Sequence, residues 1–147
     1  MAQFSTNRRV EFVHTDMAGV AHFSEFFRYM ESAEHEFFRS IGLSVSMNDG
    51  MDHVSWPRVA CSFDYFVPLR FEDEFEIRLG VERLGEKSVT FRADVVRNGE
   101  LCAKGRCTSV CCRVGEGGHL TGIPIPDAVR AELDKVMVEA HGRGGAG

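Results

Sequence analysis

Apolar residues in the first third of the chain recur with the period of a helix. The apolar stripe runs at spacings of four, three, four and four, and it consists of Phe26, Met30, Ala33, Phe37 and Ile41. Ser24 precedes the stripe as a candidate N-cap, and Gly42 follows it as a candidate stop. The pattern predicts one helix of about seventeen residues, which needs a sheet to cover its apolar side.

Alternation with a period of two predicts strands on both sides of this helix. A strand-like segment precedes it at 8–13, and we expect residues 1–7 to be loosely ordered. A loop or short irregular helix is expected at 44–54. Four further alternating segments follow: they are 59–67, 74–82, 89–95 and 101–114. Asn98-Gly99 is the strongest hairpin signal among the connecting turns, since both residue types tolerate a positive φ.

The order of these elements predicts an α+β fold. It reads as one strand, the long helix, four strands and a short helix from Pro126 to Val138. Consecutive strands joined by tight turns pair antiparallel, so one sheet is expected to pack against the long helix. We interpret 1–147 as a single domain, with a core of about 8–138 and a flexible tail at 139–147.

Composition narrows the function classes. The chain has 147 residues, 44% hydrophobic content and 27% charged content, which is ordinary for a globular domain. A net charge of −5 argues against a general nucleic-acid binder, because no basic surplus is available to neutralise phosphates. No apolar run reaches the length of a membrane span, and residues 1–7 lack a signal-peptide core. The expected location is the cytoplasm.

The five cysteines do not form a metal motif. Four of them cluster, at Cys102, Cys107, Cys111 and Cys112. No C-x-x-C pair occurs, so the spacing of a zinc ribbon is absent. Reduced, half-buried strand cysteines are the favoured interpretation, and no metal site is predicted.

The loop 14–23, between the first strand and the helix, combines groups that can do chemistry. It holds the carboxylate of Asp16, a turn at Gly19 and the start of the helix. The first N–H groups of a helix are unpaired and can hold an oxyanion, and a nearby carboxylate can attack a carbonyl or activate water. The alternative is that Asp16 only makes an Asx-turn or a cap.

The motif Asp16-x-x-Gly19-Val20, followed by Phe26 and Phe27 in the helix, resembles the signature of the 4-hydroxybenzoyl-CoA thioesterase family. The resemblance runs from about Val10 to Leu133. It implies the hotdog fold, in which an antiparallel sheet wraps around one long central helix. It also implies a homodimer with joined sheets and active sites at the interface, often paired into a homotetramer, and no metal or other cofactor.

The same resemblance assigns roles at the loop. Asp16 matches the catalytic carboxylate, which acts as a nucleophile or a general base, and the backbone N–H of Phe23 polarises the thioester carbonyl. His22 departs from the family pattern, and it is either a second acid–base group or an exposed loop histidine. His14 would face Asp16 if Thr15 continued the strand.

Substrate-binding residues are also implied. Trp56, the only tryptophan, is expected near the acyl pocket across a dimer interface, or else as a core or interface aromatic. Ser62 and Phe63 lie in one predicted strand and are candidate pocket residues. Lys87, and less directly Arg83, would contact the nucleotide end of coenzyme A, unless they are ordinary charges at a solvated hairpin tip.

The predicted function is hydrolysis of an acyl-CoA thioester to a free acid and coenzyme A. One alternative is a non-hydrolytic protein that binds acyl-CoA or acyl-carrier protein, although an ionised Asp16 facing an acyl pocket argues against it. Another is a hotdog hydratase or dehydratase, for which His22 with Asp16 is the only local candidate pair.

Overall fold

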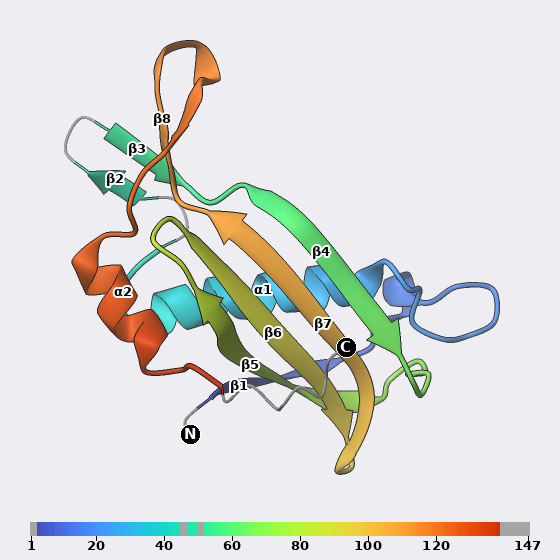
Figure 1. Cartoon of the computed structure of the whole chain (residues 1–147). Helices are drawn as coiled ribbons and strands as arrows, with labels where there is room; N and C mark the ends of the chain where they lie inside the picture. The colour runs from blue at the N-terminus through green and yellow to red at the C-terminus, as the bar shows by residue number, and fades with distance from the viewer. Residues whose placement is uncertain (1–2, 45–46, 50–51, 139–147) are drawn as a thin grey trace.

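The computed structural model describes residues 3–44, 47–49 and 52–138 (Figure 1). The predicted flexible tail, 139–147, lies outside the described residues. Within the described part, no helix is long and apolar enough to cross a membrane.

The long helix forms where the apolar stripe predicts it. Helix α1 (Glu25–Ser40) has 16 residues and buries an aromatic-rich face that includes Phe26, Met30, Ala33 and Phe37. Gly42 follows with a φ of 80°, a left-handed conformation that ends helices at little cost for glycine.

A five-stranded antiparallel sheet curves around this helix (Figure 1). Its strands, in spatial order, are β1 (Phe4–Arg9), β5 (Glu74–Leu84), β6 (Ser88–Arg97), β7 (Glu100–Val110) and β4 (Arg58–Tyr65). The inner faces of the central strands join the helix in one core, because alternate residues such as Ile77, Leu79 and Val81 are fully buried. The predicted α+β arrangement, one sheet around one long helix, is confirmed.

The hairpin signal is also confirmed. Asn98 and Gly99 connect β6 to β7 with φ values of 52° and 78°. Both values are positive, as a type I′ turn requires.

The first strand is earlier than predicted. β1 begins at Phe4 and pairs with β5 from Phe4 opposite Leu79 to Arg9 opposite Glu74, so residues 4–7 are not loosely ordered. The segment predicted to continue the strand instead forms a 3₁₀ turn, Phe12–His14. The strand prediction relied in part on the apolar residues Phe12 and Val13. Their side chains are 77% and 81% exposed, so they do not occupy buried strand positions.

A second, smaller sheet was not predicted. It contains β2 (Met47–Asp49), β3 (Asp52–Ser55), β8 (Cys112–Val114) and β9 (Leu120–Gly122). The predictions of a loop at 44–54 and of one continuous strand at 101–114 were therefore wrong. The long strand is interrupted because the N–H of Cys111 bonds to the carbonyl of Lys87, after which the chain turns to pair with β3.

The C-terminal helix is shorter than predicted. α2 (Asp127–Asp134) follows Pro126, as expected, but it ends four residues before Val138. The residues after it pair with β5 instead. The N–H of Val81 donates to the carbonyl of Val136, and the carbonyl of Val81 accepts the N–H of Val138.

Candidate active site

A tight loop presents Asp16 beside the start of α1. The N–H of Asp16 donates to the carbonyl of Val20 at 2.9 Å, and the N–H of Gly19 donates back to the carbonyl of Asp16 at 2.9 Å. Gly19 has a φ of 79°, which explains why glycine suits this position. The loop is therefore closed by its own backbone and does not depend on its exposed side chains.

The carboxylate of Asp16 is held through one of its oxygens. Oδ1 accepts the N–H of Ala18 at 2.8 Å and, less closely, the N–H of Val20 at 3.4 Å. The alternative that Asp16 makes an Asx-turn therefore holds for Oδ1. Within the described residues, Oδ2 has no hydrogen-bond partner and stays available to a substrate or a water.

A cavity of about 320 Å³ opens next to this carboxylate. Asp16 and Phe23 both lie on its wall, together with Phe26 of α1 and Tyr65 at the end of β4. The rest of the lining is mainly apolar, so a group entering the cavity meets one carboxylate in a largely hydrophobic surrounding.

The N–H of Phe23 is an unpaired donor at the helix entrance. It donates to no acceptor among the residues the structure describes. The next two N–H groups are occupied, since Ser24 donates to Nδ1 of His22 at 3.2 Å and Glu25 donates to the carbonyl of His22 at 2.9 Å. The hydroxyl of Tyr65 donates to the carbonyl oxygen of Phe23 at 2.8 Å and anchors this backbone.

His22 works as a cap in this arrangement. Its Nδ1 also lies 2.8 Å from the hydroxyl of Ser24, and its ring stacks on Phe23 at 4.5 Å between centroids. His22 is not among the residues that line the Asp16 cavity. Ser24, predicted as an N-cap, stands at that position but makes no capping bond with its side chain.

His14 does not face Asp16 in the way the strand hypothesis required. Residues 12–14 form a 3₁₀ turn, so Thr15 does not continue a strand from His14. The ring of His14 accepts the N–H of Glu11 at 3.0 Å and lies 3.1 Å from the hydroxyl of Tyr29.

Comparison with known proteins identifies the family of this chain. Residues 10–133 match the profile of the Thioesterase-like superfamily. The chain belongs to this superfamily.

Individual relatives extend the match. The 1,4-dihydroxy-2-naphthoyl-CoA hydrolase of Prochlorococcus marinus is 35% identical over 101 residues, which are 64% of this chain and 67% of that protein. A hypothetical protein from Aquifex aeolicus has a crystal structure with a TM-score of 0.80 and 32% identity, covering 88% of this chain and 98% of that one. The structure of a gentisyl-coenzyme A thioesterase gives a TM-score of 0.75 and 26% identity, covering 88% of this chain and 98% of that one. The predicted hotdog fold is confirmed, and the relatives support thioester hydrolase activity.

Two predicted pocket residues of this thioesterase-like chain lie on opposite faces of β4. Phe63 packs inward against Phe26, at 5.8 Å between ring centroids, and stacks on Tyr65 at 5.9 Å. It therefore supports the cavity wall from behind. Ser62 is exposed and alternates with Phe63, so it points away from that wall.

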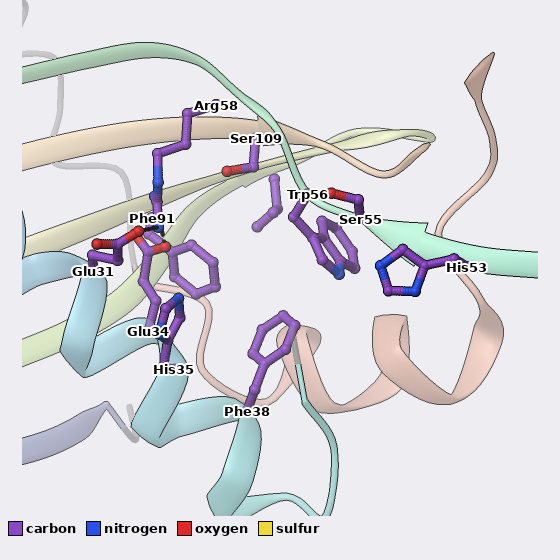
Figure 2. Close-up of a pocket in the computed structure, with 11 residues that line it drawn as sticks. Glu31, Glu34, His35, Phe38, His53, Ser55, Trp56, Arg58, Phe91 and Ser109 are labelled. Atoms are coloured by element: carbon purple, nitrogen blue, oxygen red, sulfur yellow. Dashed lines mark hydrogen bonds and ion pairs between the residues drawn. The ribbon is translucent and has the colours of Figure 1, made fainter. Parts of the chain in front are cut away.

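The remaining predicted residues lie at the other end of α1. Trp56 lines a second cavity, near Phe38 of the helix (Figure 2). Arg83 and Lys87 are exposed around the β5–β6 turn, which lies near α2 and away from the end where α1 begins (Figure 1). A single chain thus brings Asp16 and Phe23 together, but does not bring Trp56, Arg83 or Lys87 to them.

Sequence reasoning missed two residues, Tyr65 and Glu34. Tyr65 lies within the predicted strand 59–67, and no short motif marks its bond to Phe23. Glu34 is only 4% exposed, although a charged side chain on a helix is usually solvated. The spacing of Glu34 indicates its burial, because it lies four residues from Met30 and four from Phe38, which are both buried.

Proposed function

We propose that the chain hydrolyses an acyl-CoA thioester, with Asp16 as nucleophile or general base and the N–H of Phe23 as oxyanion donor. The observation that carries this proposal is that Asp16, which has one open carboxylate oxygen, and Phe23, which has an unpaired N–H, both line one largely apolar cavity. On the motif Asp16-x-x-Gly19-Val20, we assign the chain within its superfamily to the 4-hydroxybenzoyl-CoA thioesterase family.

The reaction follows from these two groups. The thioester oxygen accepts the N–H of Phe23, so the charge that develops on it lies at the positive end of the helix dipole. Asp16 then either attacks the carbonyl carbon or takes a proton from a water that attacks it. The carbon–sulfur bond breaks, and coenzyme A leaves as a thiolate that acquires a proton.

Both routes consume one water and give one acid and one thiol. In the nucleophilic route, the water hydrolyses a mixed anhydride on Asp16; in the general-base route, it attacks directly. Neither route uses a cofactor. His22 contributes by occupying the N–H of Ser24, while the neighbouring N–H of Phe23 stays free to donate.

The active unit in this proposal is a homodimer. β4 is an edge of the five-stranded sheet, and it exposes 62% of Val59 and 44% of Tyr65. An unpaired, partly apolar edge is a template for pairing with a second copy. A two-fold antiparallel pairing of β4 sets the Arg58 end of one protomer beside the Tyr65 end of the other.

That pairing would explain why the predicted substrate-binding residues lie far from Asp16 within one chain. Trp56, Arg83 and Lys87 lie toward the Arg58 end, so they approach the Asp16 cavity of the other copy. Trp56 then adjoins the acyl group, and Lys87 is the better placed of the two cations for a nucleotide phosphate. Association of two dimers into a tetramer is the further expectation from the resemblance.

The compartment proposed is the cytoplasm. All five cysteines are free thiols, which is typical of a reducing environment.

The direct test is a hydrolysis screen over short, long and aromatic acyl-CoAs. The proposal expects free thiol and free acid in equal amounts from at least one class. Binding of acyl-CoA without release of thiol would favour the non-hydrolytic alternative. Loss of enoyl-CoA absorbance without release of thiol would favour a hydratase, although Nδ1 of His22 already contacts Ser24.

A further inference from the structure

Two cysteines face each other across the neighbouring strands β4 and β7 (Figure 1). Cys61 on β4 and Cys107 on β7 are direct register partners, and their Sγ atoms lie 2.7 Å apart. Directly paired Cα atoms in antiparallel strands are about 4.5–5.5 Å apart, which falls within the range of about 4.4–6.8 Å that a disulfide spans. The sheet therefore holds the two thiols where one bond can join them without a rearrangement of the backbone.

The two thiols lie in different surroundings. Cys61 is exposed and lines a hollow of about 450 Å³ together with Met30 and Arg58, whereas Cys107 is fully buried. Burial raises the pKa of the Cys107 thiol, even though Arg58, whose Nη1 donates to its Sγ at 2.9 Å, acts in the opposite direction. Oxidation of a cysteine follows its exposure and its thiolate character. A dissolved oxidant is therefore expected to meet Cys61 first, while Cys107 waits beside it as a protonated thiol.

Neither the Asp16 cavity nor the proposed dimer uses this pair. Neither cysteine is among the residues that line the Asp16 cavity. The hollow at Cys61 includes Phe27 and Met30 of α1, so the side chain of Cys61 lies on the helix side of the sheet. The proposed dimer instead pairs β4 through the hydrogen-bonding edge of its backbone. Both thiols belong to one chain, so a bond between them needs no contribution from a second copy.

We propose that Cys61 and Cys107 are a peroxide-responsive pair, in which a hydroperoxide oxidises Cys61 and Cys107 converts the product into a reversible disulfide. The proposal does not depend on the proposed thioesterase function, because no step in it involves Asp16 or a thioester.

The reaction has two balanced steps. The thiolate of Cys61 attacks one oxygen of hydrogen peroxide, the O–O bond breaks, and Cys61 becomes a sulfenic acid while the released hydroxide takes up a proton. The sulfur of Cys107 then displaces the hydroxyl group of the sulfenic acid, and the proton of the Cys107 thiol leaves with that hydroxyl as water. In sum, two thiols and one hydrogen peroxide give one disulfide and two waters.

The second step protects Cys61 from irreversible oxidation. A sulfenic acid that meets more peroxide becomes a sulfinic acid, which ordinary thiols do not reduce, whereas a disulfide returns to two thiols. Disulfides in a reducing compartment are usually transient and redox-sensing, and the structure has both cysteines as free thiols. The pair would thus record peroxide as a bond that ties the edge strand β4 to β7.

Mass spectrometry of the whole reduced protein after exposure to hydrogen peroxide tests the proposal. Free thiols are blocked with iodoacetamide before digestion. Trypsin places Cys61 in the peptide 59–70 and Cys107 in the peptide 107–113. The second peptide carries two further cysteines, so fragmentation of the linked pair identifies the bonded one. We expect a link between Cys61 and Cys107 in most of the chains whose Cys61 is oxidised, and its complete loss after treatment with dithiothreitol.

Three variants assign the roles. Cys61→Ser, at an exposed site, should remove the link and leave Cys107 unmodified. Cys112→Ala, at another buried cysteine, is the matched control and should keep the link. In Cys107→Ala, dimedone should trap the sulfenic acid of Cys61 at least about tenfold more than in the wild type, because no neighbouring thiol removes it.

The wild type and Cys61→Ser decide the outcome even if Cys107→Ala fails to fold. Oxidation of Cys61 to a sulfinic acid without a link to Cys107 would overturn the proposal. A bond from Cys61 to the same residue of a second chain, or to Cys111 or Cys112 as often as to Cys107, would also overturn it.

Discussion

The hydroxyl of Tyr65, at the end of β4, donates a 2.8 Å hydrogen bond to the carbonyl oxygen of Phe23, at the entrance of α1. The bond joins the edge strand of the sheet to the backbone that carries the proposed oxyanion donor. Tyr65 also lines the Asp16 cavity, so one side chain both shapes the cavity and anchors the donor.

Replacing Tyr65 with Phe should slow hydrolysis without unfolding the protein. Removal of one hydrogen bond leaves the Phe23 backbone less fixed, and we expect kcat to fall about 3- to 10-fold with little change in KM. Steady-state kinetics on an accepted acyl-CoA measure this. Tyr29→Phe, which removes the only other tyrosine hydroxyl, is the control. An unaltered kcat in Tyr65→Phe would show that this bond does not position the donor.

Substitution of Gly19 tests whether activity depends on the shape of the Asp16 loop. An added Cβ at Gly19 would meet no atom within 4 Å, so Gly19→Ala acts through its φ of 79° alone. The strain of about 1–2 kcal/mol should distort the loop and lower both the melting temperature and kcat. Gly117→Ala provides a matched comparison, since Gly117 has a φ of 68° and equally open space in the β8–β9 connection. It should lose similar stability but keep its activity; equal activity losses would contradict a specific role for the loop.

The fold could be predicted where a periodic pattern of apolar residues extends over many positions. α1 and the strands β5, β6 and β7 span 10 to 16 residues each, enough for a clear period. β2, β8 and β9 have three residues each, too few to display one. β1 was misplaced because its sequence, FSTNRR, is mostly polar, and pairing with β5 decides its position.

The site was predictable where a local rule applies. Asp16 and Phe23 follow from the motif and from the unpaired donors of a helix start. The bond of Tyr65 to Phe23 joins residues 42 positions apart, and the pairing of Arg58 with Glu34 joins residues 24 apart. Neither contact leaves a pattern in the sequence, because each joins β4 to α1 or to the loop before it and forms only when the sheet packs against the helix.

The edge strand β4 gives a test of the dimer. Val59→Lys places a charge on the proposed seam, and it should weaken dimerisation about tenfold or more and lower activity in parallel. Sedimentation across a range of concentrations measures the association. Leu120→Lys, at a side chain on β9 that is 47% exposed, should leave the dimer intact. A monomeric wild type, or a Val59→Lys variant as dimeric as the wild type, would contradict pairing through β4.

Glu34 predicts a pH dependence of stability. Burial raises its pKa from 4.5 to about 7, even though Arg58 beside it acts in the opposite direction. The folded protein therefore holds this proton more tightly than the unfolded chain. The contribution is fully present below pH 4.5 and is lost as the pH rises through about 7. The free energy of unfolding should fall by up to about 3 kcal/mol over that window because of this group.

Urea denaturation of the wild type and of Glu34→Gln, at pH 4.5, 6 and 7.5, isolates the effect as a difference. As the pH rises, the wild type should lose up to about 3 kcal/mol of unfolding free energy relative to Glu34→Gln. Glu36→Gln, at a residue whose pKa is lowered by its bonds to Thr6 and Arg8 despite partial burial, should keep the wild-type slope in this window. A constant difference between Glu34→Gln and the wild type would mean that Glu34 titrates normally.

The most direct measurement is the rate at which Asp16→Asn releases thiol from an acyl-CoA that the wild type hydrolyses, with Asp134→Asn as a control at an exposed site on α2. If the open oxygen of Asp16 attacks the thioester or activates water, kcat falls by about a hundredfold or more in Asp16→Asn, while its melting temperature stays close to that of the wild type. A folded Asp16→Asn variant that hydrolyses at the wild-type rate would contradict the account.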